Sequence, residues 1–199
     1  TLINIIASMI PIAVLQLAIL PALSKHLGSQ AYGVQVTVIA LINVIPGTLG
    51  NALNNIRLLR NEAYRQKEAK GDFSVIALLF VIITMVATTI GSIYYEGANA
   101  LSISLTTVMG ILWLMREYLI VTFRIQLNFL GILINNALLA IGYYLGYLMF
   151  VRFGATWHAI YLCGNAISVM YVLFCSRIWR EPLNRSVLFP ETLKETLHI

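Results

Sequence analysis

Asparagine and arginine side chains at helical spacing are the residues of this 199-residue chain that could do chemistry. Carboxamides exchange hydrogen bonds with the hydroxyls of a sugar, and a guanidinium group binds an anion such as a diphosphate. The candidate carboxamides are Asn43, Asn51, Asn54 and Asn135, and the candidate guanidinium groups are those of Arg57, Arg116 and Arg124. We interpret these seven residues as a hypothetical substrate-binding set.

Small and polar residues fall on one face of four apolar segments. In one of them Asn43, Gly47, Asn51 and Asn54 are spaced by four, four and three residues, which is a helical repeat. Packing explains the Gly and Thr positions of such faces, because small residues let backbones approach and polar groups hydrogen-bond across the interface. A hydrated cavity is the other interpretation, and it is favoured by four asparagines, Asn55 included, in one segment.

A candidate hinge lies beside the asparagines at Pro46 and Gly47. Proline removes a backbone donor and bends a helix, so this position could move in a conformational cycle, or it could be a tolerated kink. Arg116 and Arg124 could also be simple anchors that reach toward the headgroups. Glu117 could pair with either arginine or take part in ion coupling.

The elements that must hold these residues are membrane-spanning helices. Apolar residues make up 59% of the chain and charged residues 11%, and the mean hydropathy is +0.84. Soluble domains have roughly 45–50% apolar and about 25% charged residues. Breaks at charged and Gly/Pro/Asn-rich positions leave six segments near the ~20 residues that a spanning helix needs. They are 2–23, 34–56, 73–95, 98–115, 129–151 and 157–175, and they predict an all-α membrane protein with a six-helix bundle.

The basic residues are distributed unevenly between the two predicted sides of the membrane. Of thirteen Lys and Arg residues, five fall in the loop 57–72, two in the connection between the fourth and fifth spans, and four in the tail. Basic residues in short loops resist translocation, so this side of the plasma membrane is predicted to be cytoplasmic. Both termini are then on the cytoplasmic side. Topology therefore explains the net charge of +5 without nucleic acid.

Enzymatic chemistry has little support in the sequence. The histidines, His26, His158 and His198, are scattered, and no His/Cys/Asp/Glu set has metal-ligand spacing. Neither a nucleophile elbow nor a phosphate-binding glycine loop occurs, and Cys163 and Cys175 are interpreted as packing residues. We expect no enzyme, no metal and no cofactor, and coupling to H⁺ or Na⁺ stays open.

Residues 20–34, LPALSKHLGSQAYGV, carry a resemblance to a transporter family. They resemble the first loop of the polysaccharide flippases, P-x-x-x-x-x-L-G-x-x-x-Y-G, the O-antigen and teichoic-acid export branch of the multidrug/oligosaccharidyl-lipid/polysaccharide superfamily. Ser29-Gln30 stands where that family often has Pro-Glu or Pro-Asp. Further similarity lies in the basic loop after the second span, in Arg116 and Arg124 followed by Phe129, and in the final FPETLKETLHI at 189–199.

The resemblance implies a transporter of about twelve to fourteen helices in two six-helix lobes around a central cavity, working by alternating access. Residues 1–176 would be the N-terminal lobe and 177–199 a cytoplasmic connector toward a missing C-terminal lobe. The chain begins at Thr1 and not at an initiator Met, which fits the expectation that it is part of a longer protein.

The implied function is translocation of an undecaprenyl-diphosphate-linked oligosaccharide across the bacterial plasma (inner) membrane, for surface polysaccharide such as O-antigen, lipopolysaccharide or capsule. The expected partners are this lipid-linked oligosaccharide, the lipid bilayer, the second lobe and polysaccharide polymerase machinery. One alternative is a cation-coupled multidrug exporter of the same superfamily, which the absence of Asp or Glu from the middle of every predicted span disfavours. The other is a six-helix membrane enzyme or accessory subunit.

Overall fold

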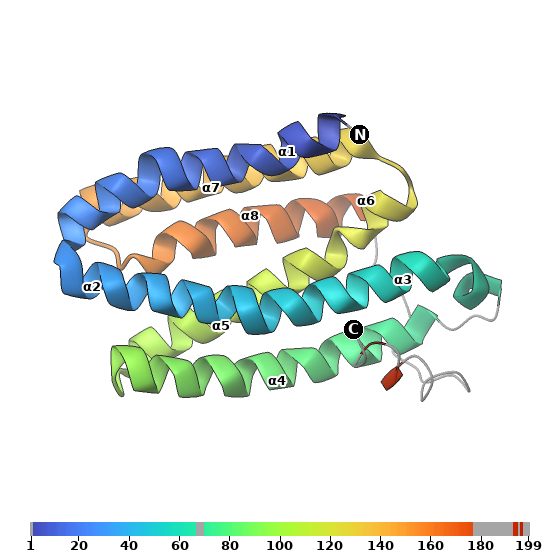
Figure 1. The fold of residues 1–199 in the computed structure, drawn as a ribbon, viewed down its shortest axis with the longest axis horizontal. Coiled ribbons are helices and arrows are strands. Elements are labelled where there is room, and N and C mark those ends of the chain that lie inside the picture. The colour runs from blue at the N-terminus through green and yellow to red at the C-terminus, as the bar shows by residue number, and fades with distance from the viewer. Residues whose placement is uncertain (1, 67–69, 177–192, 195, 197–199) are drawn as a thin grey trace.

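The computed structural model describes residues 2–66, 70–176, 193–194 and 196, and all regular structure in these ranges is helical (Figure 1). The elements are α1 (Leu2–Ala13), η1 (Val14–Ile19, a π-helix), α2 (Leu20–Ile42), η2 (Asn43–Gly47, a π-helix), α3 (Thr48–Gln66), α4 (Lys70–Glu96), α5 (Ala100–Leu119), α6 (Val121–Ile125), α7 (Phe129–Phe153) and α8 (His158–Ser176). The predicted all-helical class is confirmed for these ranges. The predicted connector 177–199 lies outside the described residues except at 193, 194 and 196.

Four helical stretches in the described ranges are long and apolar enough to cross a membrane: Ala7–Glu62, Gly71–Glu96, Phe129–Phe153 and His158–Ser176. The first covers two of the predicted spans. Helix α5, which contains the predicted span 98–115, is not among the four; it has several Ser and Thr residues and carries Arg116 and Glu117 near its end. The structure is compatible with a membrane-embedded protein, and the count of six spans stays a prediction.

The outer surface of the bundle is apolar, as lipid contact requires. Helix α4 is an example, because Ile82, Val86, Ile90 and Ile93 are all exposed along its length. Soluble monomers rarely expose a continuous apolar patch of this kind, since it would order water or aggregate. Hydrocarbon around these side chains removes that cost.

The chain reverses direction inside α2, where the sequence predicts a loop over 24–32. Helices α1 and α3 run in opposite directions in Figure 1, and between them Gly28 has φ 74° and ψ 169°. These angles are accessible to glycine and strained for residues with a Cβ. One glycine thus makes the turn, so the residues on both sides of it stay helical.

Replacing Gly28 with alanine is expected to destabilise the chain by about 1–3 kcal/mol, the usual cost of a non-glycine residue in such a conformation. The cost is conformational, because no heavy atom lies within 4 Å of the added Cβ. Thermal unfolding in detergent micelles measures it. Gly33→Ala is the control, since Gly33 also faces open space but without the positive φ, and it should stabilise the helix by about 0.5–1 kcal/mol. Equal responses of the two variants would contradict the strained turn.

Glycines bring neighbouring helices into close contact, as the packing interpretation of the polar faces predicts. A Cβ on Gly142 of α7 would lie 2.6 Å from the Cα of Gly164 on α8. A Cβ on Gly110 of α5 would lie 2.6 Å from Thr88 Cγ2 and 3.2 Å from Thr84 Cγ2 on α4. These Gly and Thr positions therefore pack helix against helix, and the cavity has to be formed by other residues.

Candidate functional site

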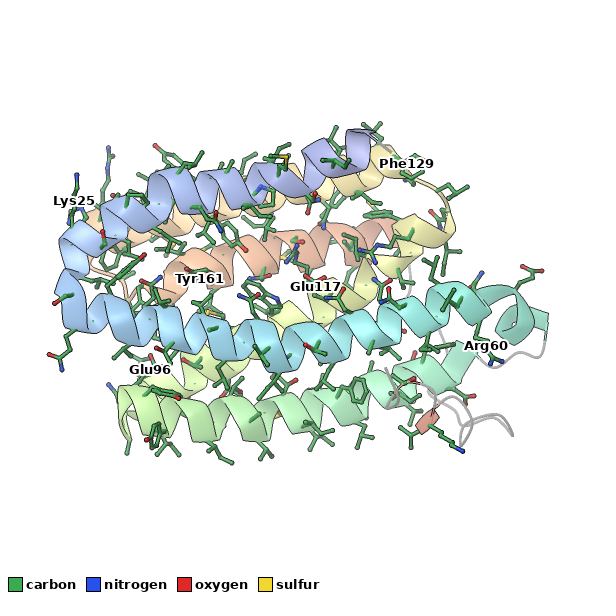
Figure 2. The ribbon with its side chains drawn as sticks, viewed as in Figure 1. Lys25, Arg60, Glu96, Glu117, Phe129 and Tyr161 are labelled. Atoms are coloured by element: carbon green, nitrogen blue, oxygen red, sulfur yellow. The ribbon has the colours of Figure 1, made fainter. Side chains whose placement is uncertain are left out.

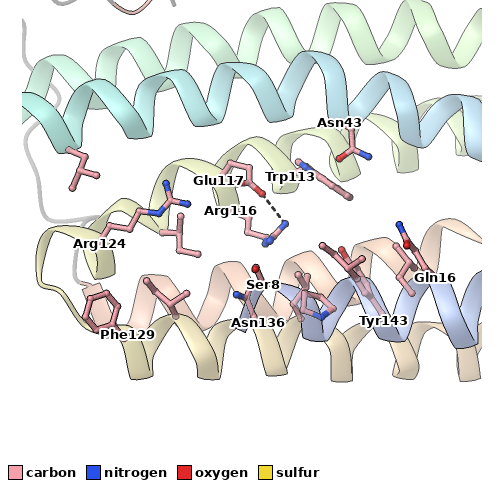
Figure 3. A pocket seen from close by; sticks show the side chains of 17 residues that line it. Ser8, Gln16, Asn43, Trp113, Arg116, Glu117, Arg124, Phe129, Asn136 and Tyr143 are labelled. Atoms are coloured by element: carbon pink, nitrogen blue, oxygen red, sulfur yellow. Dashed lines mark ion pairs between the residues drawn. The ribbon is translucent and has the colours of Figure 1, made fainter. Parts of the chain in front are cut away.

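A cavity of about 650 Å³ lies between the helices of the N-terminal half and α5–α7 (Figure 3). Its polar and aromatic lining comes from six elements, α1, η1, η2, α5, α6 and α7, and combines amides, hydroxyls and charges with aromatic rings. The residues that give it this character are Ser8, Gln16, Asn43, Trp113, Arg116, Glu117, Arg124, Phe129, Asn136 and Tyr143. The cavity is large enough for a small polar group such as a sugar ring or a diphosphate.

Arg116 and Glu117, near the end of α5, form an ion pair at the wall of the cavity. Arg116 Nη1 lies 3.0 Å from Glu117 Oε1, and Figure 3 draws this contact. The guanidinium carbon also lies 6.0 Å from the ring centroid of Trp113. Arg116 Nε is buried and has no hydrogen-bond partner among the described atoms. The guanidinium group is therefore only partly satisfied by the protein.

Asn54 holds the second guanidinium group and does not itself line the cavity. Its side chain is fully buried, and its Nδ2 donates to the backbone oxygen of Glu117 at 2.7 Å. Its Oδ1 accepts a hydrogen bond from Arg124 Nη1 at 3.2 Å. The approach of α3 to α5 that permits these contacts depends on Gly50, where a Cβ would lie 2.9 Å from the backbone oxygen of Leu114. Asn54 is a positioning residue for Arg124.

Arg57 lies outside the cavity wall, in the contact between α3, α4 and α5. It is 5% exposed and donates a hydrogen bond to the Tyr118 hydroxyl. Its guanidinium carbon lies 5.7 Å from the ring centroid of Phe73 and 5.6 Å from that of Tyr118. These contacts favour a structural role over the hypothesised contact with substrate.

The remaining predicted carboxamides lie in three different environments. Asn43 is exposed on η2 and lines the cavity, whereas Asn51 is exposed and is not among the residues that line it. Asn135 is fully buried against α8, where its Oδ1 accepts a hydrogen bond from Ser168 Oγ at 2.9 Å. Of the seven predicted residues, the structure brings Asn43, Arg116 and Arg124 to one cavity.

The hypothetical hinge lies in a π-helical turn. Pro46 and Gly47 are both buried within η2, next to Asn43. Proline lacks the N–H that an α-helix needs and its ring presses on the preceding turn, so local widening of the helix there has a direct cause. A Cβ on Gly47 would lie 3.6 Å from Trp113 Nε1, which puts this turn against the cavity wall. Movement at the turn stays a prediction.

Two amide residues that line the cavity are not among the predicted site residues. Asn136 is 5% exposed and lines the cavity, yet its side chain makes no hydrogen bond with any other described residue. It follows Asn135, and successive residues of a helix point about 100° apart, so only one of the two can face α8. Gln16 is one of two amides in the first predicted span, with Asn4, and only its position in an apolar segment could have indicated it.

Comparisons with family models, curated proteins and solved structures find no match to this chain. The cavity and the sequence pattern are thus the basis on which a function can be proposed.

Proposed function

We propose that this chain is the N-terminal lobe of a flippase that moves an undecaprenyl-diphosphate-linked oligosaccharide from the inner to the outer leaflet of the bacterial plasma membrane by alternating access. Moving a glycan through hydrocarbon would leave its polar groups unsatisfied at a cost of several kcal/mol each. A polar cavity inside an apolar-coated bundle lowers that cost while the lipid tail stays in the bilayer. Trp113 and Tyr143 add flat rings that suit the apolar faces of sugars.

The observation that carries this proposal is an excess of unsatisfied hydrogen-bond donors on one cavity. Arg116 and Arg124 oppose the single carboxylate of Glu117, so the lining carries a net positive charge. Arg116 has one donor, its buried Nε, without a hydrogen-bond partner, and the amide of Asn136 makes no hydrogen bond with the residues that the structure describes. A diphosphate can bind a guanidinium group through two parallel hydrogen bonds, in competition with the carboxylate. The amides then remain for the hydroxyls of the glycan.

The charge distribution along the bundle supports entry of an anionic lipid from the cytoplasm. Lys25 and Glu96 lie at one end of the bundle and Arg60 at the other (Figure 2). Helix α6, which holds Arg124, lies toward the Arg60 end in Figure 1. If the more basic side is cytoplasmic, as the loops indicate, the arginine-bearing part of the cavity is nearer the inner leaflet. Substrate would therefore meet the guanidinium groups early in the cycle.

The alternatives have less support from the cavity. A multidrug exporter needs an acidic group for a cationic substrate, and Glu117 does line the cavity, but it lies 3.0 Å from Arg116 and is outnumbered by arginine. For a membrane enzyme, the residues that line the cavity include Ser8 but no His, Cys or Asp that could activate it. An accessory subunit would have no use for unsatisfied donors on a cavity.

Arg116→Ala, introduced into the gene at its native locus, is expected to lower surface polysaccharide about tenfold or more. A hydrogen bond to a charged group contributes about 1.5–3 kcal/mol, and 1.4 kcal/mol corresponds to a factor of about ten. Immunoblotting of membranes checks that the variant is made. Arg152→Ala is the matched control, because Arg152 is exposed on α7 and does not line the cavity.

Wild-type polysaccharide from Arg116→Ala and from Asn136→Leu, with normal protein levels, would exclude the cavity as the binding site. The gene provides a separate test of the two-lobe proposal. We expect it to encode six or more further spans after Ile199, and a stop codon at that point would contradict the two lobes.

A further inference from the structure

An enclosed ionic cluster outside the cavity joins Glu96 on α4 to His158 on α8. His158 Nε2 lies 2.9 Å from Glu96 Oε1, and the two side chains are only 2% and 6% exposed. Glu96 Oε2 accepts hydrogen bonds from Ser92 Oγ at 2.8 Å and from Thr106 Oγ1 at 2.7 Å. Thr106 belongs to α5, so this cluster joins three helices at the end of the bundle opposite Arg60 (Figure 2).

The hydrogen-bond pattern identifies the atom of His158 that is free to take up a proton. His158 Nε2 also lies 3.0 Å from Thr106 Oγ1. Because the Thr106 hydroxyl donates to Glu96 Oε2 and a carboxylate can only accept, Nε2 carries the hydrogen that points at these oxygens. The other nitrogen, Nδ1, is buried and has no partner among the described atoms. A proton on Nδ1 converts the neutral imidazole into an imidazolium ion and the existing hydrogen bond into an ion pair, with no other bond made or broken.

The surroundings leave this pair isolated from other charges. Trp157 stacks on the imidazole with ring centroids 3.8 Å apart. Facing groups are the hydroxyls of Ser92 on α4 and Thr106 on α5. Beyond Trp157 lies Tyr161 on α8, which is bound to Gln35 of α2 and contacts Tyr143 on α7. Among the described residues no Lys or Arg pairs with Glu96. The charge of the cluster is therefore set by the proton itself.

We propose that Glu96 and His158 form a proton-binding site, and that the proton on His158 Nδ1 holds α4, α5 and α8 together at this end of the bundle. An imidazolium ion adds the attraction of opposite charges to the hydrogen bond with the Glu96 carboxylate, and burial strengthens that attraction. Loss of the proton leaves a buried carboxylate with weaker partners, and the three helices separate more easily. The site lies next to exposed residues at Gly97 and Thr156, so protons reach it from the solvent at this end.

Ring contacts connect this site with the cavity. Tyr143 lines the cavity and contacts Tyr161 at a centroid distance of 5.8 Å. Tyr161 in turn lies 6.1 Å from Trp157, which stacks on His158. Movement of α8 on proton loss would therefore displace Tyr143 in the cavity wall. The use of the proton in transport rests on the proposed flippase function, whereas the site itself does not.

Nitrogen NMR of the chain labelled at histidine, in lipid nanodiscs, tests the site without any substrate. The three histidines are assigned by His26→Gln and His158→Gln. We expect the Nδ1 resonance of His158 to move from the unprotonated toward the protonated position as the sample is taken from about pH 8 to about pH 5. In Glu96→Gln the same nitrogen should stay unprotonated over that range. A resonance that does not move with pH, that moves equally in Glu96→Gln, or that responds to Na⁺ and not to pH would overturn the proposal.

Spin-label distances test the coupling to helix movement. Nitroxides at Ala98→Cys and Thr156→Cys, both exposed positions, flank the pair once Cys163 and Cys175 are replaced by alanine. We expect a longer distance at pH 8 than at pH 5, and a distance independent of pH in His158→Gln. His26→Gln is the matched control, because His26 is exposed, and it should keep the pH dependence. A pH-independent distance in the parent, or a pH response that persists in His158→Gln, would overturn the proposal. Failure of the flippase function would instead appear as normal polysaccharide in Arg116→Ala.

Discussion

Replacing Gly142 with leucine is expected to separate α7 from α8 and to prevent the chain from reaching a stable fold. A Cβ at this position would lie 2.6 Å from Gly164 Cα and 2.8 Å from the backbone oxygen of Cys163, so the obstacle is backbone that cannot rotate away. Overpacking by even a methyl group costs about 1–3 kcal/mol, and a leucine adds three further carbons at the same point. Thermal unfolding in micelles, with Gly142→Ala as the intermediate step, measures the effect.

The control for this prediction is Gly33→Leu, on α2. No heavy atom lies within 4 Å of a Cβ at Gly33, so a leucine there points into open space and should leave the unfolding temperature near that of the parent chain. The comparison separates a steric effect at one interface from a general intolerance of leucine. If Gly142→Leu unfolds at the parent temperature, the close approach of α7 to α8 is wrong.

Hydropathy and helical spacing predict the helical class and most segment positions, because burial in lipid is a property of each segment alone. The predicted span 129–151 corresponds to α7 (Phe129–Phe153), and 157–175 to α8 (His158–Ser176). The connection predicted at 24–32 is a turn at Gly28 in the structure, and it is shorter than expected for a local reason. A single glycine at positive φ can reverse the chain, and composition cannot distinguish it from a longer loop.

The site is less predictable, because it depends on which helices meet. The four-residue spacing puts Asn43 on a polar face, but it cannot tell that Asn54 bonds Arg124 or that Asn135 faces Ser168. Asn136 and Asn135 are equivalent in the sequence and differ only in the neighbour that each one faces. Glu96 and His158 are 62 positions apart. Their contact follows from the packing of α5 against both α4 and α8, which the residue spacing does not predict.

Arg57→Ala is expected to lower the free energy of unfolding by about 2–4 kcal/mol. The substitution removes a hydrogen bond from a charged donor to the Tyr118 hydroxyl and the contacts of a buried guanidinium group with the rings of Phe73 and Tyr118. These contacts join α3 to α4 and α5, so their loss should weaken the packing of these three helices. Tyr118→Phe keeps the ring and deletes only the hydroxyl, and it should cost about 1–2 kcal/mol, within the range for one hydrogen bond. Unfolding in micelles compares the two variants.

The same variant distinguishes a structural arginine from a substrate-binding one. Arg116 contributes to the cavity wall and has an unused donor, so Arg116→Ala should keep the parent unfolding temperature and lose surface polysaccharide. Arg57→Ala should instead lower the unfolding temperature. Surface polysaccharide should then fall only in proportion to the amount of folded protein. If Arg57→Ala instead unfolds like the parent while polysaccharide is lost, Arg57 contacts the substrate in a conformation other than this one. That outcome would restore the interpretation of Arg57 as an anion-binding residue and would require α3 to move relative to α5 during transport.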